Sequence, residues 1–527
     1  MAPEGPLNTN KHETPKSLGS TQTQGVESPP KTFIGTLGRL GPGMIIAGSI
    51  VGSGELIATT KTGAEAGFWL LWLIIIGCVI KVSTQIEFAR HVIAWGETPL
   101  KALNGVPGPR LRVNWLLWYW TLMTMFVILQ QGGILGGVGQ TLAIGCPLTQ
   151  YGAEYNRRHD EIVKARIEIK VLQAQGRDPA QRDCWTELQQ NVSLLSEQIG
   201  QSREPHDPYL WAVILAIVTS IMLYIGKYRV IQFIATVLVA TFTLVTILTV
   251  VALQTRAEWA VRGHEIARGL SFHLPPASLT TGANPIRTAL GAFGIIGVGA
   301  AELIMYPYWC LEKGYAKSTG RRDGTVQWVE RARGWIRVLY VDASTSMVVY
   351  TFATLAFYLL GAAVLGRIGI NPEGRDMVRT LAAMYVPVFG PWAHIVFLSG
   401  AFAVLYSTFF VAAAGNARMV ADALGLFRLT DGSEASRDKW TRLISAVWPF
   451  VALWLYAYVR APVAMIVACG IAQSVMLPLL GAAALYFRYR RSDPDLRPGR
   501  LWAILLWVSF AAFLVIGGWS IFAVFGG

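Results

Sequence analysis

The sequence predicts an all-α polytopic membrane protein with about eleven transmembrane helices. Hydrophobic residues make up 53% of the 527 residues and charged residues only 15%, whereas a soluble domain carries about 25% charged residues. Apolar stretches of about twenty residues, which is the length that crosses a bilayer, recur along most of the chain. Two of these stretches are interrupted by glycines and contain a glutamate. The composition therefore indicates a polytopic membrane protein, and the two interrupted stretches indicate where its functional site lies.

The predicted spans are joined by short loops except at one place. They cover 33–64, 67–94, 113–145, 208–226, 230–253, 286–316, 335–364, 384–416, 441–459, 461–488 and 500–525. Lysine and arginine concentrate in the alternate loops that lie on the side of the N-terminus, and the positive-inside rule makes that side cytoplasmic. We therefore expect a multi-pass protein of the cell membrane, with its N-terminus in the cytoplasm and its C-terminus outside.

Two polar segments lie outside these spans. Residues 1–32 are rich in Pro, Ser, Thr and Gly and lack the apolar core of a signal peptide, which predicts a disordered cytoplasmic tail. Residues 148–207 carry charges of both signs and apolar residues at alternating spacings of three and four, which predicts an extracytoplasmic helical hairpin. Cys146 and Cys184 both fall on the extracytoplasmic side. The sequence gives equal weight to a disulfide between them and to two unpaired thiols.

The first span contains the stretch that carries the functional prediction. Gly41–Thr60 holds five glycines, one proline and Glu55. Glycine costs helix stability relative to alanine, and a carboxylate at membrane depth usually marks a substrate or ion path. The stretch that ends at Glu302 repeats the pattern, because both are runs of small residues followed by Glu-Leu-Ile. Such paired interruptions indicate a transporter site, with close helix packing through small residues as the alternative.

The two interrupted stretches divide the transmembrane region into two halves of five helices each. The halves cover 33–253, including the hairpin insert, and 286–488, and 500–525 forms an eleventh helix. An odd number of spans in each half gives the halves opposite orientations in the membrane, as in inverted-repeat transporters. The sequence therefore predicts an inverted 5+5 repeat in which helices 1 and 6 are broken.

A lysine and a further glutamate lie in the second predicted span. Lys81 falls at membrane depth, where a charged side chain needs a partner, and Glu87, Glu55 and Glu302 are candidates. The sequence leaves open whether Lys81 neutralises a carboxylate or takes the place of a coupling cation.

Several short motifs occur in an order that is typical of one family. They are Gly41-Pro-Gly43, Ala89-Arg90 with Gly96-Glu-Thr98, Gly226-Lys-Tyr-Arg229, Asp342 within Tyr340-Val-Asp-Ala-Ser344, Ser399-Gly400 with Gly415-Asn416, and Gln473-Ser-Val-Met-Leu-Pro478. Over about 40–490, apart from the 148–207 insert, the chain resembles the NRAMP divalent-metal transporter family. This resemblance implies a leucine-transporter-like fold in the lipid bilayer and a divalent metal ion as substrate, with no cofactor.

The signature residues depart from the family pattern. Where the family carries Asp-Pro-Gly-Asn in the first helix, this chain has Gly52-Ser-Gly-Glu55. The sixth-helix motif Met-Pro-His falls on Ala301-Glu-Leu-Ile304, so the methionine and the histidine are missing. The acids of the third helix are also absent. The chain therefore resembles a divergent, NRAMP-related branch whose metal specificity differs from that of the family.

The substitutions favour a harder metal ion. Glu55 and Glu302, if they face one cavity, are two anionic oxygen ligands, and carbonyls near Gly52 and Gly299 and the amide of Gln473 complete the expected shell. Carboxylate, carbonyl and water ligands suit Mg, Ca and Mn, and Mg²⁺ is often held by one or two carboxylates. We expect uptake of Mg²⁺ or Mn²⁺ by alternating access, which the membrane potential can drive without proton coupling.

Other functions remain open on the sequence alone. A transporter of an amino acid or another amine-bearing solute would bind the amine through Glu55 or Glu302, with Lys81 in place of a coupling ion. A non-transporting sensor or scaffold would use the hairpin, although the helix breaks argue against it. Asp342 and Gln473 are either site or coupling residues or packing hydrogen bonds. No motif indicates an enzyme or a nucleic-acid-binding module.

Overall fold

Helices account for nearly all of the structure. The computed structural model describes residues 25–175, 203–225, 228–276, 285–373 and 377–525, with positions 190, 193, 194 and 197 of the insert. Within this part of the chain, ten helical segments are long and apolar enough to cross a membrane. Helix α11 (Tyr228–Leu253) lies where the fifth span is predicted and brings the long helices there to eleven. The predicted all-α multi-pass architecture is confirmed.

The spans follow the chain in the predicted order. They are α2 (Pro42–Ile50) with η1 (Ser53–Thr59) and α3 (Thr60–Ala66), α4 (Leu71–Val79) with α5 (Lys81–Trp95), α7 (Trp115–Gly145), α10 (Asp207–Ile225), α11, α13 (Pro285–Ile295) with α14 (Ala300–Lys313), α16 (Val326–Leu360) with η4 (Gly361–Gly366), α19 (Ala393–Leu426), α20 (Glu434–Val459), α21 (Pro462–Tyr486) and α22 (Arg500–Phe525). The first and sixth spans are each broken near their middle, as predicted.

Several span boundaries differ from the prediction by seven to ten residues, namely the starts expected at 33, 335, 384 and 441 and the end expected at 416. The first span begins at Pro42, which occupies the first helical turn, where proline is well tolerated; a separate short helix, α1, covers Phe33–Leu37. The eighth span begins at Ala393 and follows two short helices, α17 (Met377–Ala383) and α18 (Val386–Phe389). Gly390, at φ +53°, ends α18 in a left-handed conformation. Apolar composition continues across this turn, so the sequence pattern placed the span too early.

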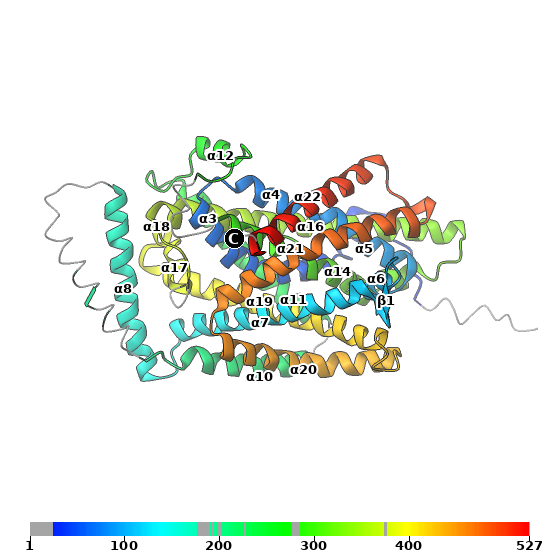
Figure 1. Cartoon of the computed structure of the whole chain (residues 1–527), viewed down its shortest axis with the longest axis horizontal. Helices are drawn as coiled ribbons and strands as arrows, with labels where there is room; N and C mark the ends of the chain where they lie inside the picture. The colour runs from blue at the N-terminus through cyan, green and yellow to red at the C-terminus, as the bar shows by residue number, and fades with distance from the viewer. Residues whose placement is uncertain are drawn as a thin grey trace, which may run out of the picture.

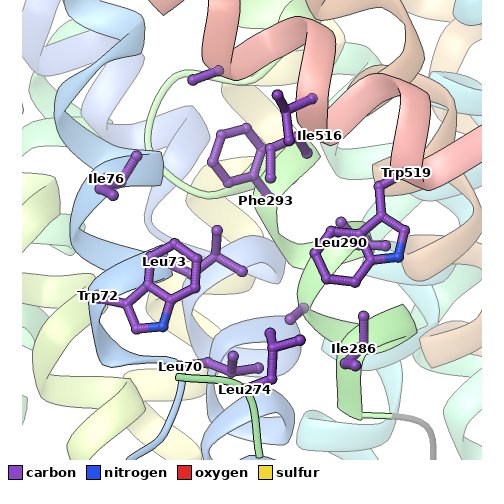
Figure 2. A pocket seen from close by; sticks show the side chains of 13 residues that line it. Leu70, Trp72, Leu73, Ile76, Leu274, Ile286, Leu290, Phe293, Ile516 and Trp519 are labelled. Atoms are coloured by element: carbon purple, nitrogen blue, oxygen red, sulfur yellow. The ribbon is translucent and has the colours of Figure 1, made fainter. Parts of the chain in front are cut away.

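The two broken helices occupy the centre of the molecule. In both broken spans 94% of the most apolar window is buried, against 28% for α22, which therefore lies at the periphery. Helix α2 packs against α11, α16 and α19, and α13 packs against α21. Between α4, α13 and α22 an apolar cavity of about 220 Å³ remains, bordered by Trp72, Phe293 and Trp519 (Figure 2). The site region is thus enclosed by other helices.

Smaller elements collect at the two ends of the helix bundle (Figure 1). Helix α8 (Gln150–Gln175), the first arm of the insert, stands across one end, near α17 and α18. Helix α6 (Pro99–Asn104) and the strand pair β1 (Arg110–Leu111) and β2 (Val113–Asn114) lie at the opposite end. The second arm of the predicted hairpin falls almost wholly outside the described residues.

The N-terminal segment contacts the helices at its described end. Residues 1–24 of the expected tail lie outside the described residues. Glu27 donates its N–H to the Ser318 carbonyl at 3.1 Å, accepts from Trp335 Nε1 at 3.1 Å and pairs with Arg39 at 2.9 Å. The last part of the expected tail is therefore attached to α15 (Tyr315–Thr319) and to α16. Cys146 is exposed and Cys184 lies outside the described residues, so their pairing stays a prediction.

Candidate functional site

The break in the sixth span is organised by one glycine. Gly297, at φ +57°, ends α13 in the left-handed conformation that glycine adopts readily. A Cβ atom there would lie 2.9 Å from the Cα of Cys78, so the position is also sterically closed to side chains. The Gly297 N–H points out of its own helix and donates to Glu55 Oε1 at 3.1 Å. The first broken span therefore touches the second directly at this point.

Glu55 is fully buried in the first turn of η1. Its Oε1 accepts hydrogen bonds from the Gly297 N–H and, at 3.2 Å, from the hydroxyl of Thr354 on α16. Its Oε2 is buried and has no hydrogen-bond partner. A buried polar atom without a partner is costly, so this oxygen is available to a proton or a cation.

Glu302 occupies the equivalent place in the other broken span. Both glutamates are the third helical residue after a glycine cap, Gly52 before η1 and Gly299 before α14. A negative charge is favourable there because the helix dipole is positive at the N-terminus. Glu302 Oε1 lies 3.5 Å from Ser49 Oγ, and its Oε2 is buried without a partner. The repeat seen in the sequence thus corresponds to a repeat in structure.

Both glutamates lie beside the break between α13 and α14. Glu55 binds the N–H of Gly297, and a Cβ placed on Gly299, two residues later, would lie 2.4 Å from Glu302 Oε2. The charge of Lys81 interacts electrostatically with both glutamates. No group of three or more His, Cys, Asp or Glu able to hold a metal occurs among the described residues.

A chain of amide groups links the two broken helices. Gln473 on α21 accepts from the Ala301 N–H through Oε1 at 3.0 Å, and its Nε2 lies 3.4 Å from Gln130 Oε1. Gln130 on α7 donates in turn to Ser53 Oγ at 3.1 Å. Gln473 was predicted from the family resemblance, whereas the role of Gln130 was missed. A glutamine inside an apolar span was the signal that could have identified it.

The predicted backbone ligands are already hydrogen-bonded within their helices. The Gly52 carbonyl accepts from the Leu56 N–H at 2.8 Å, and the Gly299 carbonyl accepts from the Leu303 N–H at 2.9 Å. Each carbonyl has two lone pairs, so each keeps one for another partner. In this structure the two carbonyls accept the first hydrogen bonds of their half-helices. Their role as ligands stays a prediction.

The carbonyls freed by the first break are bonded by hydroxyls of α19. Thr408 Oγ1 lies 3.2 Å from the Gly48 carbonyl and 3.4 Å from that of Val51, and Ser407 Oγ lies 3.3 Å from the Gly48 carbonyl. A Cβ on Gly52 would overlap the Thr408 side chain at 1.8 Å, so glycine is what allows this approach. Sequence reasoning missed both hydroxyl residues, since serine and threonine are unremarkable in spanning helices.

Lys81 contacts backbone carbonyls in the broken helix. Its Nζ donates to the carbonyl of Phe293 and, at 2.8 Å, to that of Ile296. The predicted partners were Glu55, Glu302 or Glu87. The first two are reached through electrostatic interaction, and the direct hydrogen bonds go to main-chain oxygens.

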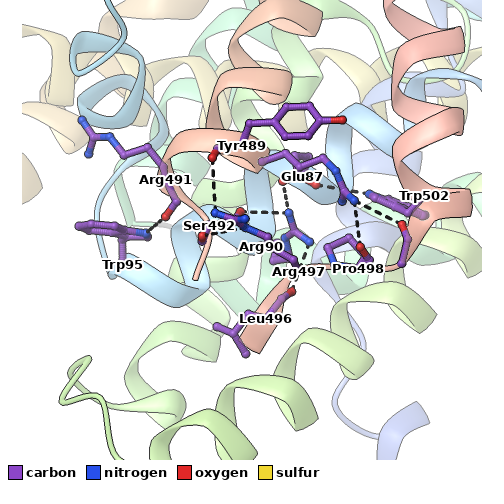
Figure 3. Close-up of polar contacts among 12 residues, drawn as sticks. Glu87, Arg90, Trp95, Tyr489, Arg491, Ser492, Leu496, Arg497, Pro498 and Trp502 are labelled. Atoms are coloured by element: carbon purple, nitrogen blue, oxygen red, sulfur yellow. Dashed lines mark hydrogen bonds and ion pairs between the residues drawn. The ribbon is translucent and has the colours of Figure 1, made fainter. Parts of the chain in front are cut away.

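Glu87 belongs to a separate cluster at the far end of α5 (Figure 3). Its Oε1 forms an ion pair with Arg90, and its Oε2 accepts from Trp502 Nε1 at 3.3 Å. Arg90 also donates to Ser492 Oγ at 3.1 Å and lies 3.4 Å from the Leu496 carbonyl. These contacts join α5 to the segment between α21 and α22. They stabilise the packing of these helices and lie away from the break.

Asp342 caps the first span rather than contacting the break. Its Oδ1 accepts from the Gly41 N–H at 2.9 Å, and its Oδ2 accepts from the Gly43 N–H at 2.6 Å and from the Tyr306 hydroxyl at 2.8 Å. The first N–H groups of a helix lack partners within the helix. Asp342 supplies these partners from α16 and ties the start of α2 to α14.

Comparison with known proteins assigns the chain to a family. Residues 204–523, more than half of the chain, match the family described as Natural resistance-associated macrophage protein-like, or Nramp. The chain belongs to the Nramp family. Nramp proteins are metal-ion transporters rather than enzymes, and the metal is their substrate rather than a cofactor. Recognition of the family from the sequence motifs is therefore confirmed.

Solved structures show the Nramp fold across almost the whole chain. Two crystal structures of mutants of the manganese transporter of Eremococcus coleocola have TM-scores of 0.57 at 16% and 15% identity, covering 97% of this chain and 92% of theirs. Mhp1, a nucleobase-cation-symport-1 family transporter, has a TM-score of 0.50 at 15% identity, covering 91% and 90%. No curated protein matches the sequence. These likenesses establish the leucine-transporter-like fold.

Proposed function

We propose that this Nramp protein carries a hard divalent cation, Mg²⁺ or Mn²⁺, across the membrane by alternating access. The observation that carries the proposal is the pair of buried carboxylate oxygens, Oε2 of Glu55 and Oε2 of Glu302, that have no hydrogen-bond partner at the break. A cation between the two half-helix N-termini would satisfy both oxygens. Burial of an ionised carboxylate is costly unless it is paired or coordinates a metal.

The chemistry of the surrounding groups supports a hard ion. Oxygen atoms around the break come from the carboxylate, amide and hydroxyl groups of Glu55, Glu302, Gln473 and Thr354. The nearby Cys469 thiol is already hydrogen-bonded to Gln130. Oxygen ligands suit Mg and Mn, whereas thioethers favour softer metals. Since two carboxylates are fewer than the six ligands of Mg²⁺, we propose that the ion keeps several waters, as Mg²⁺ commonly does.

We propose uptake into the cell, driven by the membrane potential. Each charge that crosses the membrane gains about 2.3 kcal/mol per 100 mV, so a divalent cation gains about 4.6 kcal/mol. Helix α7, which spans Trp115–Gly145, contains no acidic residue that could relay protons. These two points support transport without obligatory proton coupling.

We further propose the arrangement in the cell membrane that the loops favour, with the N-terminus inside and the C-terminus outside. Residues 33–253 and 286–488 would form the two inverted halves, joined by the equivalent glutamates at the breaks. The 148–207 insert would then lie outside, which agrees with the position of α8 at the end of the bundle away from α6 (Figure 1).

Uptake into proteoliposomes tests this function. The purified protein is reconstituted, an inside-negative potential is imposed, and entry of Mg²⁺, Mn²⁺ and Ca²⁺ is measured together with internal pH. The variants are Glu55→Gln and Glu302→Gln, which keep size and remove charge. Glu154→Gln is the matched control, because Glu154 lies exposed on α8 and pairs with Arg158 one turn away.

The expected result is entry of Mg²⁺ or Mn²⁺ by the wild type and the control, and loss of entry in both site variants without an accompanying proton flux. Normal entry in both site variants would contradict the proposed site. If folded wild-type protein admits no divalent cation but accumulates an amine-bearing solute, the transporter belongs to the organic-solute class. If it transports neither, the sensor or scaffold function gains support.

A further inference from the structure

The end of α13 forms a small cradle of backbone oxygens. Helix α13 ends at Ile295, and α14 begins only at Ala300, so the last carbonyls of α13 lack the N–H groups of a continuing helix. The N–H of Gly297 would face the Phe293 carbonyl in a regular helix, but it donates to Glu55 instead. The carbonyls of Phe293 and Ile296 are therefore left for another donor.

The donor that fills this cradle is the ammonium group of Lys81. The side chain is completely buried, and its Nζ bonds to both carbonyls and lies 4.6 Å from the centre of the Phe293 ring. The C-terminal end of a helix carries negative partial charge, which favours a cation there. In transporters with discontinuous helices, unwound carbonyls and half-helix C-terminal ends are the groups that coordinate a coupling cation.

We propose that the Lys81 ammonium is a built-in cation that permanently occupies the carbonyl cradle of α13 and stands in for a dissociable coupling ion. It holds the end of α13 against α5 through the bonds to Phe293 and Ile296. Its positive charge also offsets part of the charge of Glu55 and Glu302. This last step rests on the proposed function. If a divalent cation is the substrate, the charge of Lys81 lowers the free-energy cost of returning the empty site across the membrane.

The formal charge of the site shows why the Lys81 ammonium matters when no metal cation is bound. Two ionised glutamates at one break carry a formal charge of −2, and Lys81 reduces the charge of the empty site to −1. A buried charge is costly in proportion to how poorly it is compensated. A transporter of this form needs no sodium ion to stabilise the break, so its transport should not depend on sodium.

Chemical rescue tests the cradle independently of transport. Lys81→Ala removes the ammonium and opens a space beside the two carbonyls, whereas Lys81→Met removes the charge and keeps most of the side-chain volume. The melting temperature of each purified protein is measured in detergent with ethylammonium, with sodium, and with ethanol as the neutral control of similar size. We expect Lys81→Ala to melt several degrees below the wild type and to recover part of that loss with ethylammonium but not with ethanol.

Wild type and Lys81→Met should show no ethylammonium response, because their cradles are filled. Lys81→Met should nonetheless take up the metal roughly tenfold more slowly at saturating concentration, where return of the empty and less compensated site limits turnover. Lys81→Ala that melts like the wild type, or that gains equally from ethanol, would overturn the proposal. If Lys81→Ala does not fold, Lys81→Met with wild-type melting temperature and uptake would overturn it.

Failure of this inference and failure of the proposed function are distinguishable. If the wild type takes up no divalent cation but ethylammonium still raises the melting temperature of Lys81→Ala, the proposed function fails and the cradle stands. Conversely, metal uptake that requires sodium in the wild type would contradict the built-in cation and leave the two-carboxylate site standing.

Discussion

At the scale of single residues, the site depends on glycines as much as on charged groups. Gly297 turns its N–H toward Glu55 because it adopts a left-handed conformation, and Gly52 admits Thr408 because it has no Cβ. The glutamates alone would not produce the site. Each needs the glycine that precedes it to end one half-helix and begin the next.

Substitution of Gly297 should therefore be unusually destabilising. Gly96, at φ +65° and ψ +19°, is also left-handed but has open space around its Cβ position, so Gly96→Ala measures the backbone cost alone, about 1–2 kcal/mol. Gly297→Ala adds a contact of 2.9 Å with the backbone of Cys78, and overpacking of this kind costs about 1–3 kcal/mol more. Thermal unfolding in detergent compares the two variants. Equal melting temperatures would show that the crowding at Cys78 is relieved at no cost.

Residue-level prediction succeeded where the sequence repeats itself. Glu55 and Glu302 were found because both follow small residues and precede Leu-Ile, and the structure places both in equivalent first turns. Thr354 and Thr408 were not found. A threonine in a spanning helix can bond its own preceding turn, as Thr354 does with the Tyr350 carbonyl, so its partner across the bundle depends on packing that sequence does not show.

At the scale of elements, each broken helix is completed by side chains from its neighbours. Hydroxyls of α19 bond the carbonyls of the first break, and Lys81 of α5 bonds those of the second. Inside a membrane protein, a backbone N–H or C=O that lacks a partner in its own helix must be hydrogen-bonded by another group. The breaks are thus part of the packing between helices.

Thr408→Val should weaken the first break selectively. The substitution keeps the shape of the side chain but removes the hydroxyl that lies near the Gly48 and Val51 carbonyls. Leaving a buried carbonyl unsatisfied costs about 1–3 kcal/mol, so the melting temperature should fall. Thr124→Val is the control, because the Thr124 hydroxyl donates to the carbonyl of Trp120 in its own helix. A fall of the same size in both variants would show that the break is not what Thr408 stabilises.

The insert is attached to the segment that precedes α19. Arg379 on α17 is buried and donates to Asp160 at 2.6 Å and to Asn156 at 2.7 Å, both on α8. Arg379→Ala should therefore release α8 and speed proteolytic cleavage within 150–175, with little effect on the helices of the bundle. Arg158→Ala, which breaks an exposed pair within α8, is the control. Unchanged cleavage of Arg379→Ala would show that other contacts hold α8.

Element prediction failed for the eighth span because apolar composition runs through a turn. Seven of the expected spans begin within four residues of their starts in the structure. The eighth begins at Ala393 instead of 384, and the first, seventh and ninth begin at Pro42, Val326 and Glu434 instead of 33, 335 and 441. The short helices α17 and α18 are apolar because they are packed against α19 and α11. Burial against protein and burial in lipid both select apolar residues, so composition cannot separate them.

At the scale of the whole molecule, the two broken spans form a pseudo-symmetric pair with unequal surroundings. Both glutamates follow a capping glycine by three residues, but Glu55 has two hydrogen-bond donors and Glu302 one distant hydroxyl. Glu302 therefore has fewer internal contacts to lose when a cation binds. The family and the fold could be predicted from motif order, whereas the placement of both glutamates beside one break required the structure.

This asymmetry predicts unequal variants. Glu302→Gln should weaken divalent-cation binding with little change in stability, because its carboxylate has one contact at 3.5 Å. Glu55→Gln should both weaken binding and lower the melting temperature, because an amide replaces an acceptor bonded by Gly297 and Thr354. Melting curves with and without Mn²⁺ measure both effects. Identical behaviour of the two variants would contradict the assigned contacts.

The central claim is that Glu55 and Glu302 share one cation, and anomalous X-ray scattering from crystals soaked with Mn²⁺ tests it most directly. Manganese is visible at its absorption edge, so its position needs no assumption about the ligands. The account predicts one anomalous peak at the α13–α14 break, in contact with both carboxylates and absent from Glu55→Gln crystals. A transport-competent protein whose manganese peak touches neither glutamate would contradict it.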